Sequence, residues 1–158
     1  MHAPAYLNIA LWLLLASAPL AAAAKTWQFE KNRDPLGTGY VVMANADLEA
    51  VTPMVRCWTE EAAMDVRFAL NARYRLSDAS KVALRFDEGT AQVVRWPRNA
   101  GGHALIVPAA AQQQLLSNLR AGRQLQLILT LGTGYEQTLQ IPLDGSSRAI
   151  SQVLAGCS

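Results

Sequence analysis

The sequence contains few of the residues that most enzyme and metal sites require. It has two histidines, His2 and His103, and two cysteines, Cys57 and Cys157. A metal site needs several ligands close together, and a catalytic base needs a nucleophile or an orienting acid beside it. Nucleophile-elbow, phosphate-loop and dinucleotide-binding motifs are missing as well. We therefore expect a protein that is not an enzyme and that binds neither a metal nor a cofactor.

Two pairs of adjacent carboxylates offer the main alternative to this expectation. Glu60–Glu61 and Asp87–Glu88 would suit a hydrolase only if two carboxyl groups converged across a cleft. Both pairs lie near predicted turns, where charged side chains are usually solvated. An envelope hydrolase is the weaker interpretation.

A strong charge of one sign is also missing. The chain has 14 Lys+Arg and 12 Asp+Glu, which give a formal net charge of +2, and its arginines are scattered along the predicted strands. A balance this close to neutral does not predict the electrostatic attraction that nucleic acid or an anionic membrane requires. We expect neither as a partner.

One long hydrophobic run is present, and it stands at the start of the chain. It extends from Leu7 to Leu20 and is followed by small residues that form A-x-A cleavage sites ending at Ala23 or Ala24. The alternative, a membrane anchor, needs about 20 apolar residues, more than the run supplies. We expect residues 1–24 to be a cleaved signal peptide. Residues 25–158 then form a single domain, exported to the periplasm and not inserted in the membrane.

If the chain is exported, its two cysteines are expected to form a disulfide. In an oxidising compartment, two cysteines form a bridge more often than a metal pair. Cys57 lies in the predicted strand "PMVRCWTE", and Cys157 ends an apolar stripe with Ile150, Val153 and Leu154 at helical spacing. We predict a Cys57–Cys157 disulfide that fastens the last helix to a strand.

Short alternating segments make up most of the remaining chain, which is typical of strands with one buried and one wet face. The segments are residues 25–31, 40–46, 54–58, 64–74, the hairpin 81–96 with a tight turn at Glu88-Gly89, 103–108, 123–131 and 136–143. Regular spacing of this kind predicts a mainly β fold, either an antiparallel β-sandwich or a small barrel, with two short helices.

The two predicted helices follow the strands at 109–122 and at the C-terminus. Leu115, Leu116 and Leu119 share one face of the first helix, and Gly122 ends it. The last helix has Ser146 or Ser147 as its N-cap. We expect the disulfide to hold the end of this second helix.

One cluster stands out as a candidate partner-binding site. Arg95, Trp96 and Arg98 lie next to the Gly-rich loop that leads to His103. The plainer interpretation is that Trp96 is half-buried against the sandwich. The alternative is an aromatic anchor in an interface, where Trp and Arg are enriched. His103 is a candidate for partner binding and not for catalysis.

Most of the chain from Trp27 to Cys157 resembles the type VI secretion-associated periplasmic proteins of the VasI/TagO kind. The segments that carry the resemblance are "VALRFDEGTAQVVRW", "GGHALIVP" and the stretch that closes at the last cysteine. The matching positions are Trp27, Cys57, Arg85, Phe86, Asp87, Trp96, Leu119 and Cys157. A similar order of residues is found in the invasion-associated locus B proteins.

The resemblance implies a non-enzymatic accessory protein of a cell-envelope machine, with type VI secretion as one such machine. We expect a protein partner in the envelope, bound through edge strands and the Trp96 region, and leave the oligomeric state open. The alternative is a periplasmic inhibitor or immunity protein whose exposed loop "PRNAGGH" blocks a cell-wall hydrolase or a toxin.

Overall fold

The computed structural model describes residues 27–158, which form two antiparallel sheets and two helices. The predicted signal peptide and its cleavage site lie outside the described residues. The five-stranded sheet has the order β1 (Gln28–Arg33), β2 (Tyr40–Asn45), β3 (Val51–Trp58), β4 (Ala63–Leu70), β7 (Ala104–Ile106). The four-stranded sheet has the order β6 (Gln92–Val94), β5 (Lys81–Phe86), β8 (Gln124–Thr130), β9 (Glu136–Pro142).

The alternation of side chains decides which face of each strand enters the core. In β3, Val51, Val55 and Cys57 are at most 2% exposed, whereas Met54 and Arg56 between them are half-buried. A pleated strand places successive side chains on opposite faces, so this period of two separates a core face from an outer face. The sequence predicted this pattern, and the structure confirms it.

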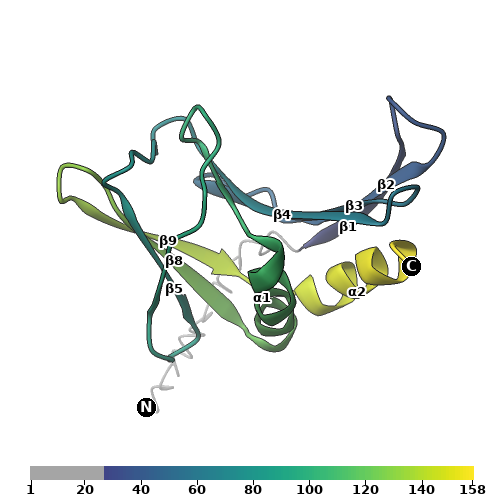
Figure 1. Ribbon diagram of the computed structural model, residues 1–158. Helices are drawn as coiled ribbons and strands as arrows, with labels where there is room; N and C mark the ends of the chain where they lie inside the picture. The colour runs from purple at the N-terminus through teal and green to yellow at the C-terminus, as the bar shows by residue number, and fades with distance from the viewer. Residues whose placement is uncertain (1–26) are drawn as a thin grey trace, which may run out of the picture.

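The two helices bury their apolar faces in the hydrophobic core. In α1 (Ala109–Ala121), Leu115, Leu116 and Leu119 are buried, as predicted. In α2 (Ser146–Gly156), Ile150 and Val153 are fully buried. α2 lies along the face formed by β1, β2 and β3 and contacts α1 (Figure 1). The C-terminal helix therefore covers one side of the five-stranded sheet.

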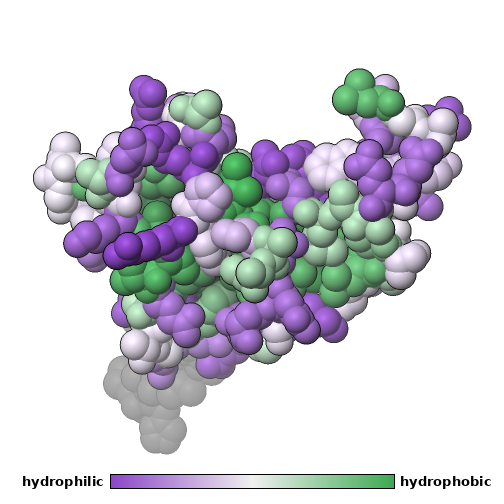
Figure 2. Space-filling view, in the orientation of Figure 1, coloured by the Kyte–Doolittle hydropathy of each residue, from purple (hydrophilic) through white to green (hydrophobic). Residues whose placement is uncertain are grey.

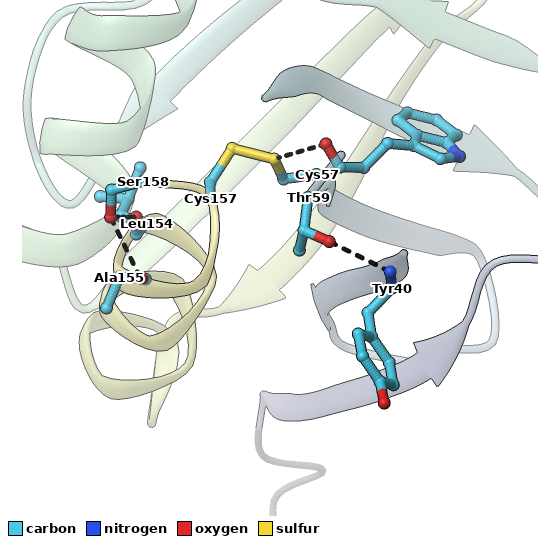
Figure 3. The surroundings of a disulfide bond; sticks show 8 residues. Tyr40, Cys57, Thr59, Leu154, Ala155, Cys157 and Ser158 are labelled. Atoms are coloured by element: carbon cyan, nitrogen blue, oxygen red, sulfur yellow. Dashed lines mark hydrogen bonds between the residues drawn. A yellow bond between two sulfur atoms is a disulfide. The ribbon is translucent and has the colours of Figure 1, made fainter. Parts of the chain in front are cut away.

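The predicted disulfide is present. Cys57 in β3 and Cys157, just after α2, are joined across a sequence separation of 100 residues (Figure 3). Close to the bridge, the Tyr40 N–H at the start of β2 donates a hydrogen bond to the Thr59 hydroxyl oxygen (3.0 Å). The bridge thus fastens the end of α2 to the sheet that the helix covers.

The mainly β class, with its antiparallel sheets and two helices, is confirmed, but the small-barrel alternative is wrong. Each sheet has two ends: β1 and β7 in the five-stranded sheet, β6 and β9 in the four-stranded sheet. A barrel requires the first and last strands to pair, which removes every edge. The two sheets remain open and contribute to one hydrophobic core, which makes the fold sandwich-like.

A predicted turn and a predicted helix cap differ from the structure. The hairpin turn between β5 and β6 lies one residue earlier than predicted, because the Gly89 N–H bonds the Phe86 carbonyl and Asp87 takes the left-handed conformation (φ 50°). The N-cap of α2 is Gly145. Ser146 is instead the first helical residue, and its hydroxyl donates to carbonyl groups inside the protein.

Candidate functional site

A groove of about 1050 Å³ opens where residues of the two sheets meet. Its walls are the turn before β5, strands β5 and β6, the segment that follows β6, and one residue of β7. The lining residues are Leu76, Ser77, Asp78, Ala79, Ser80, Lys81, Val82, Val93, Val94, Arg95, Trp96, Pro97, Arg98, Asn99, Ala100 and Leu105. We call this surface the Trp96 groove.

Trp96, one of the lining residues, connects the segment after β6 to the five-stranded sheet. Its ring stacks on that of Phe68 in β4, with ring centroids 6.5 Å apart and planes 9° from parallel. The residue is half-buried, as the plainer interpretation predicted, and it also lines the groove. A ring held in this way is pre-organised, because its side chain loses little further freedom when a ligand packs on it.

The charged groups of the groove are mainly basic. Lys81 and Arg95 are exposed, whereas the side chain of Arg98 is 29% exposed and forms an ion pair with Asp78 (2.6 Å). The Nε of Arg98 is buried and has no hydrogen-bond partner among the described residues. Val93 is 70% exposed and adds apolar surface at the rim.

His103 does not line the groove. Its backbone N–H donates to the side-chain oxygen of Asn99 (2.8 Å), which also accepts from the Ala104 N–H (3.0 Å). The Asn99 N–H in turn donates to the Ala104 carbonyl. The His103 Nδ1 is buried and without a partner among residues 27–158. These bonds hold the predicted loop "PRNAGGH" in one tight turn.

The structure therefore brings three of the four candidate residues, Arg95, Trp96 and Arg98, into one groove. Whether a partner binds there stays a prediction. The turn of residues 76–81 was not expected in the site, because strand alternation identifies the faces of a strand and not its distant neighbours. Asp78 carried no sequence signal that would have linked it to Arg98, 20 residues away.

Within residues 27–158, no group of three or more His, Cys, Asp or Glu side chains is placed to hold a metal ion. Among these residues, no helix has the length and hydrophobicity to cross a membrane.

The fold has a known counterpart. The crystal structure of invasion associated protein B from Bartonella henselae superposes with a TM-score of 0.57 at 16% sequence identity. The match covers 84% of this chain and 94% of that chain. The two proteins share a fold. No family model matches the chain, and the curated proteins contain no match either. The resemblance to the invasion-associated locus B proteins is thus supported at the level of the fold, whereas these comparisons give no support to the resemblance to VasI/TagO proteins.

Proposed function

We propose that this chain is a non-enzymatic protein-binding domain that works outside the cytoplasm. The observation that carries the proposal is the Trp96 groove. It combines a fixed indole ring, basic side chains and exposed apolar surface, the composition that protein interfaces favour. The Lys81 ammonium and the Arg95 guanidinium suit a partner that presents carboxylates beside an apolar side chain.

The setting that we propose is the cell envelope, most simply the periplasm. A disulfide across 100 residues is typical of oxidising compartments, and the sequence begins with an apolar run of signal-peptide character. An accessory role in an envelope machine fits both features. Type VI secretion is the specific machine that the sequence resemblance suggests.

A second candidate function is inhibition of a cell-wall hydrolase or toxin. The observation in its favour is the turn at residues 97–103, which is held by the Asn99 side chain and by the bond from the Ile106 N–H to the Pro97 carbonyl (2.8 Å). Inhibitory loops work best when they are rigid before binding, because less entropy is then lost.

The test is an affinity capture from periplasmic extract with the oxidised protein and two variants, Arg95→Glu and Arg123→Glu. Arg95 lines the groove and is exposed; Arg123 is also exposed but does not line it. We expect an envelope protein to be captured by the wild type and by Arg123→Glu, with recovery reduced about tenfold for Arg95→Glu.

Equal recovery by all three proteins would contradict binding through the groove. If the captured protein is a hydrolase or toxin whose activity the wild type blocks, the inhibitor function replaces the accessory one. In that case Arg98→Ala and His103→Ala should abolish the inhibition.

A further inference from the structure

β1 is an edge strand of the five-stranded sheet, and one side of its backbone is open. Hydrogen-bonded and non-bonded pairs alternate between antiparallel strands. The Asp34 N–H donates to the Gly39 carbonyl (3.1 Å), so Asp34 and Gly39 form a hydrogen-bonded pair. By alternation, Asn32 and Glu30 also form hydrogen-bonded pairs with β2. The N–H and C=O groups of Phe29, Lys31 and Arg33 consequently point away from β2. No hydrogen bond to these outward groups is found among residues 27–158.

Both ends of this edge are held in place. At the start, the Trp27 N–H donates to the Asp144 carbonyl (3.2 Å) and its indole N–H donates to the Pro142 carbonyl (3.0 Å). At the hairpin, the hydroxyl and the N–H of Thr38 donate to the Glu60 carboxylate, and these bonds lower the pKa of Glu60. The edge is therefore extended and fixed before any partner arrives, which favours binding of an added strand.

A pocket of about 370 Å³ lies beside the first half of the edge, between β1 and the first turns of α2. It is lined by Trp27, Phe29, Gly145, Arg148, Ala149 and Gln152. The aromatic rings supply an apolar wall, and the volume accommodates one medium-sized side chain. A strand added to β1 would place alternate side chains on the face that carries this pocket.

The same face is basic. Phe29, Lys31 and Arg33 project to the side of the sheet that α2 covers, because they pair in register with β2 residues of that face. The Lys31 ammonium lies 4.4 Å from the centre of the Tyr40 ring, and Arg148 of α2 borders the pocket. The surface of the β1–β2 hairpin is largely hydrophilic in the view of Figure 2.

Carboxylates lie elsewhere along the strand. Glu30 projects to the opposite face, where it accepts hydrogen bonds from Asn32 and Asn45 (both 3.4 Å). Asp34 and Asp144 lie beyond the two ends of β1. On the α2 side, the second half of the edge thus presents Lys31 and Arg33 to a strand that pairs with it.

Pairing of β1 with β1 of a second copy is disfavoured by these charges. In three antiparallel registers, at least two of the residues Phe29, Lys31 and Arg33 of one copy lie opposite residues of this same set in the second copy. They place Lys31 opposite Lys31, Lys31 opposite Arg33, or Glu30 opposite Glu30. Like charges directly opposite destabilise a strand pair, and a lysine on an edge strand protects against self-association.

We propose that β1 binds an extended acidic segment of another protein as an added antiparallel strand. The segment carries carboxylates opposite Arg33 and Lys31 and an apolar side chain opposite Phe29, which enters the pocket beside α2. Antiparallel addition continues the pairing of the whole sheet and gives the more stable ladder. The proposal shares with the proposed function only the premise that the chain binds a polypeptide, and it concerns a different surface.

The test uses the oxidised protein and a blocked synthetic peptide, Thr-Glu-Thr-Glu-Thr-Leu-Thr, followed by amide NMR. The peptide should shift the amide signals of Phe29, Lys31 and Arg33, and the same peptide with Lys in place of Glu should not. In Lys31→Pro the outward N–H is lost while the bonds to β2 remain, since proline is tolerated on an edge facing solvent. We expect it to weaken binding about tenfold.

Lys31→Ala keeps the outward N–H and should weaken binding only about two- to fivefold, the effect of one exposed charge pair. A peptide N-methylated at its Glu and Leu residues tests the backbone bonds without changing the protein, and should not bind. The proposal would be overturned if the peptide did not bind, or if Lys31→Pro or the methylated peptide bound as well as the unmodified pair. It would also be overturned if the protein formed a dimer through β1. Arg95→Glu should bind the peptide normally, so failure at this edge is distinguishable from failure at the Trp96 groove.

Discussion

Asp65 shows how a single residue organises the outer face of the five-stranded sheet. Its carboxylate accepts hydrogen bonds from the Arg56 Nε (2.7 Å) and from the Nε and Nη2 of Arg67 (both 2.8 Å). Arg56 also lies over the Trp58 ring, 4.8 Å from its centre. Burial raises the pKa of Asp65, but the bonds from Arg67 and Arg56 outweigh burial and hold this pKa below its usual value.

We predict that Asp65→Asn lowers the free energy of unfolding at neutral pH by about 1–3 kcal/mol, since two partly buried arginines lose a charged acceptor. The folded-state pKa lies below the unfolded one. The stabilisation is therefore present above about pH 4 and is lost as the pH falls through the folded-state pKa. Urea unfolding between neutral and acidic pH should show the difference between wild type and variant shrinking in acid.

Asp78→Asn is the matched control for this measurement. The Asp78 carboxylate also pairs with an arginine, Arg98, but the Asp78 side chain is 97% exposed. Removing this charge should therefore lower the free energy of unfolding by about 0–1 kcal/mol. Equal losses for Asp65→Asn and Asp78→Asn, or a loss at Asp65 that does not depend on pH, would contradict the role given to Asp65.

At the scale of elements, Ser146 joins the two helices. It is 1% exposed, and its hydroxyl lies 2.6 Å from the Leu119 carbonyl of α1 and 2.7 Å from the Leu143 carbonyl. The last turn of α1 has carbonyl groups without partners inside its own helix. A hydroxyl from α2 satisfies one of them and fixes how the two helices meet.

We predict that Ser146→Ala destabilises the protein by about 1–2 kcal/mol, because buried carbonyl groups lose their donor. Ser147→Ala, at the exposed neighbouring position, should change stability by at most about 0.5 kcal/mol. Denaturant unfolding of both variants checks the difference. A loss at Ser147 as large as that at Ser146 would contradict the role given to the buried hydrogen bonds of Ser146, because alanine by itself favours the helix.

At the scale of the whole molecule, the disulfide attaches the C-terminal end of the chain to the five-stranded sheet. The closed loop contains the whole four-stranded sheet but only β4 and β7 of the five-stranded sheet, since Cys57 lies in β3 and Cys157 follows α2. A bridge of this kind limits the unfolded chain more than the folded one. The helix at the end of the chain stays on the sheet because both its apolar face and its last turn are attached.

We predict that removing the bridge lowers the free energy of unfolding by about 4–5 kcal/mol, the value that chain entropy gives for a loop of this length. The measurement is denaturant unfolding of the oxidised protein and of Cys157→Ser, with hydrogen exchange to locate the loss. Exchange should rise first in α2. A change below about 1 kcal/mol, or protection of α2 that is unaltered, would show that packing alone holds the helix.

The sequence by itself determined the parts of this protein that depend on local pattern. Alternation in segments such as 124–130 identified strands and their buried faces, and the spacing of Leu115 and Leu119 identified the packed face of α1. The presence of only two cysteines determined the disulfide. These inferences succeed because side-chain direction in a strand or helix follows from backbone geometry.

Only the tertiary structure decided which strands are neighbours and what their edges and ends form. β5 pairs with β8 and β4 with β7 across long stretches of chain, and a period of two contains no information about such partners. The Trp96 groove, in which Asp78 meets Arg98, and the open edge of β1 both arise from this pairing. Each depends on contacts between distant residues, whose free energy exists only once the two sheets are assembled.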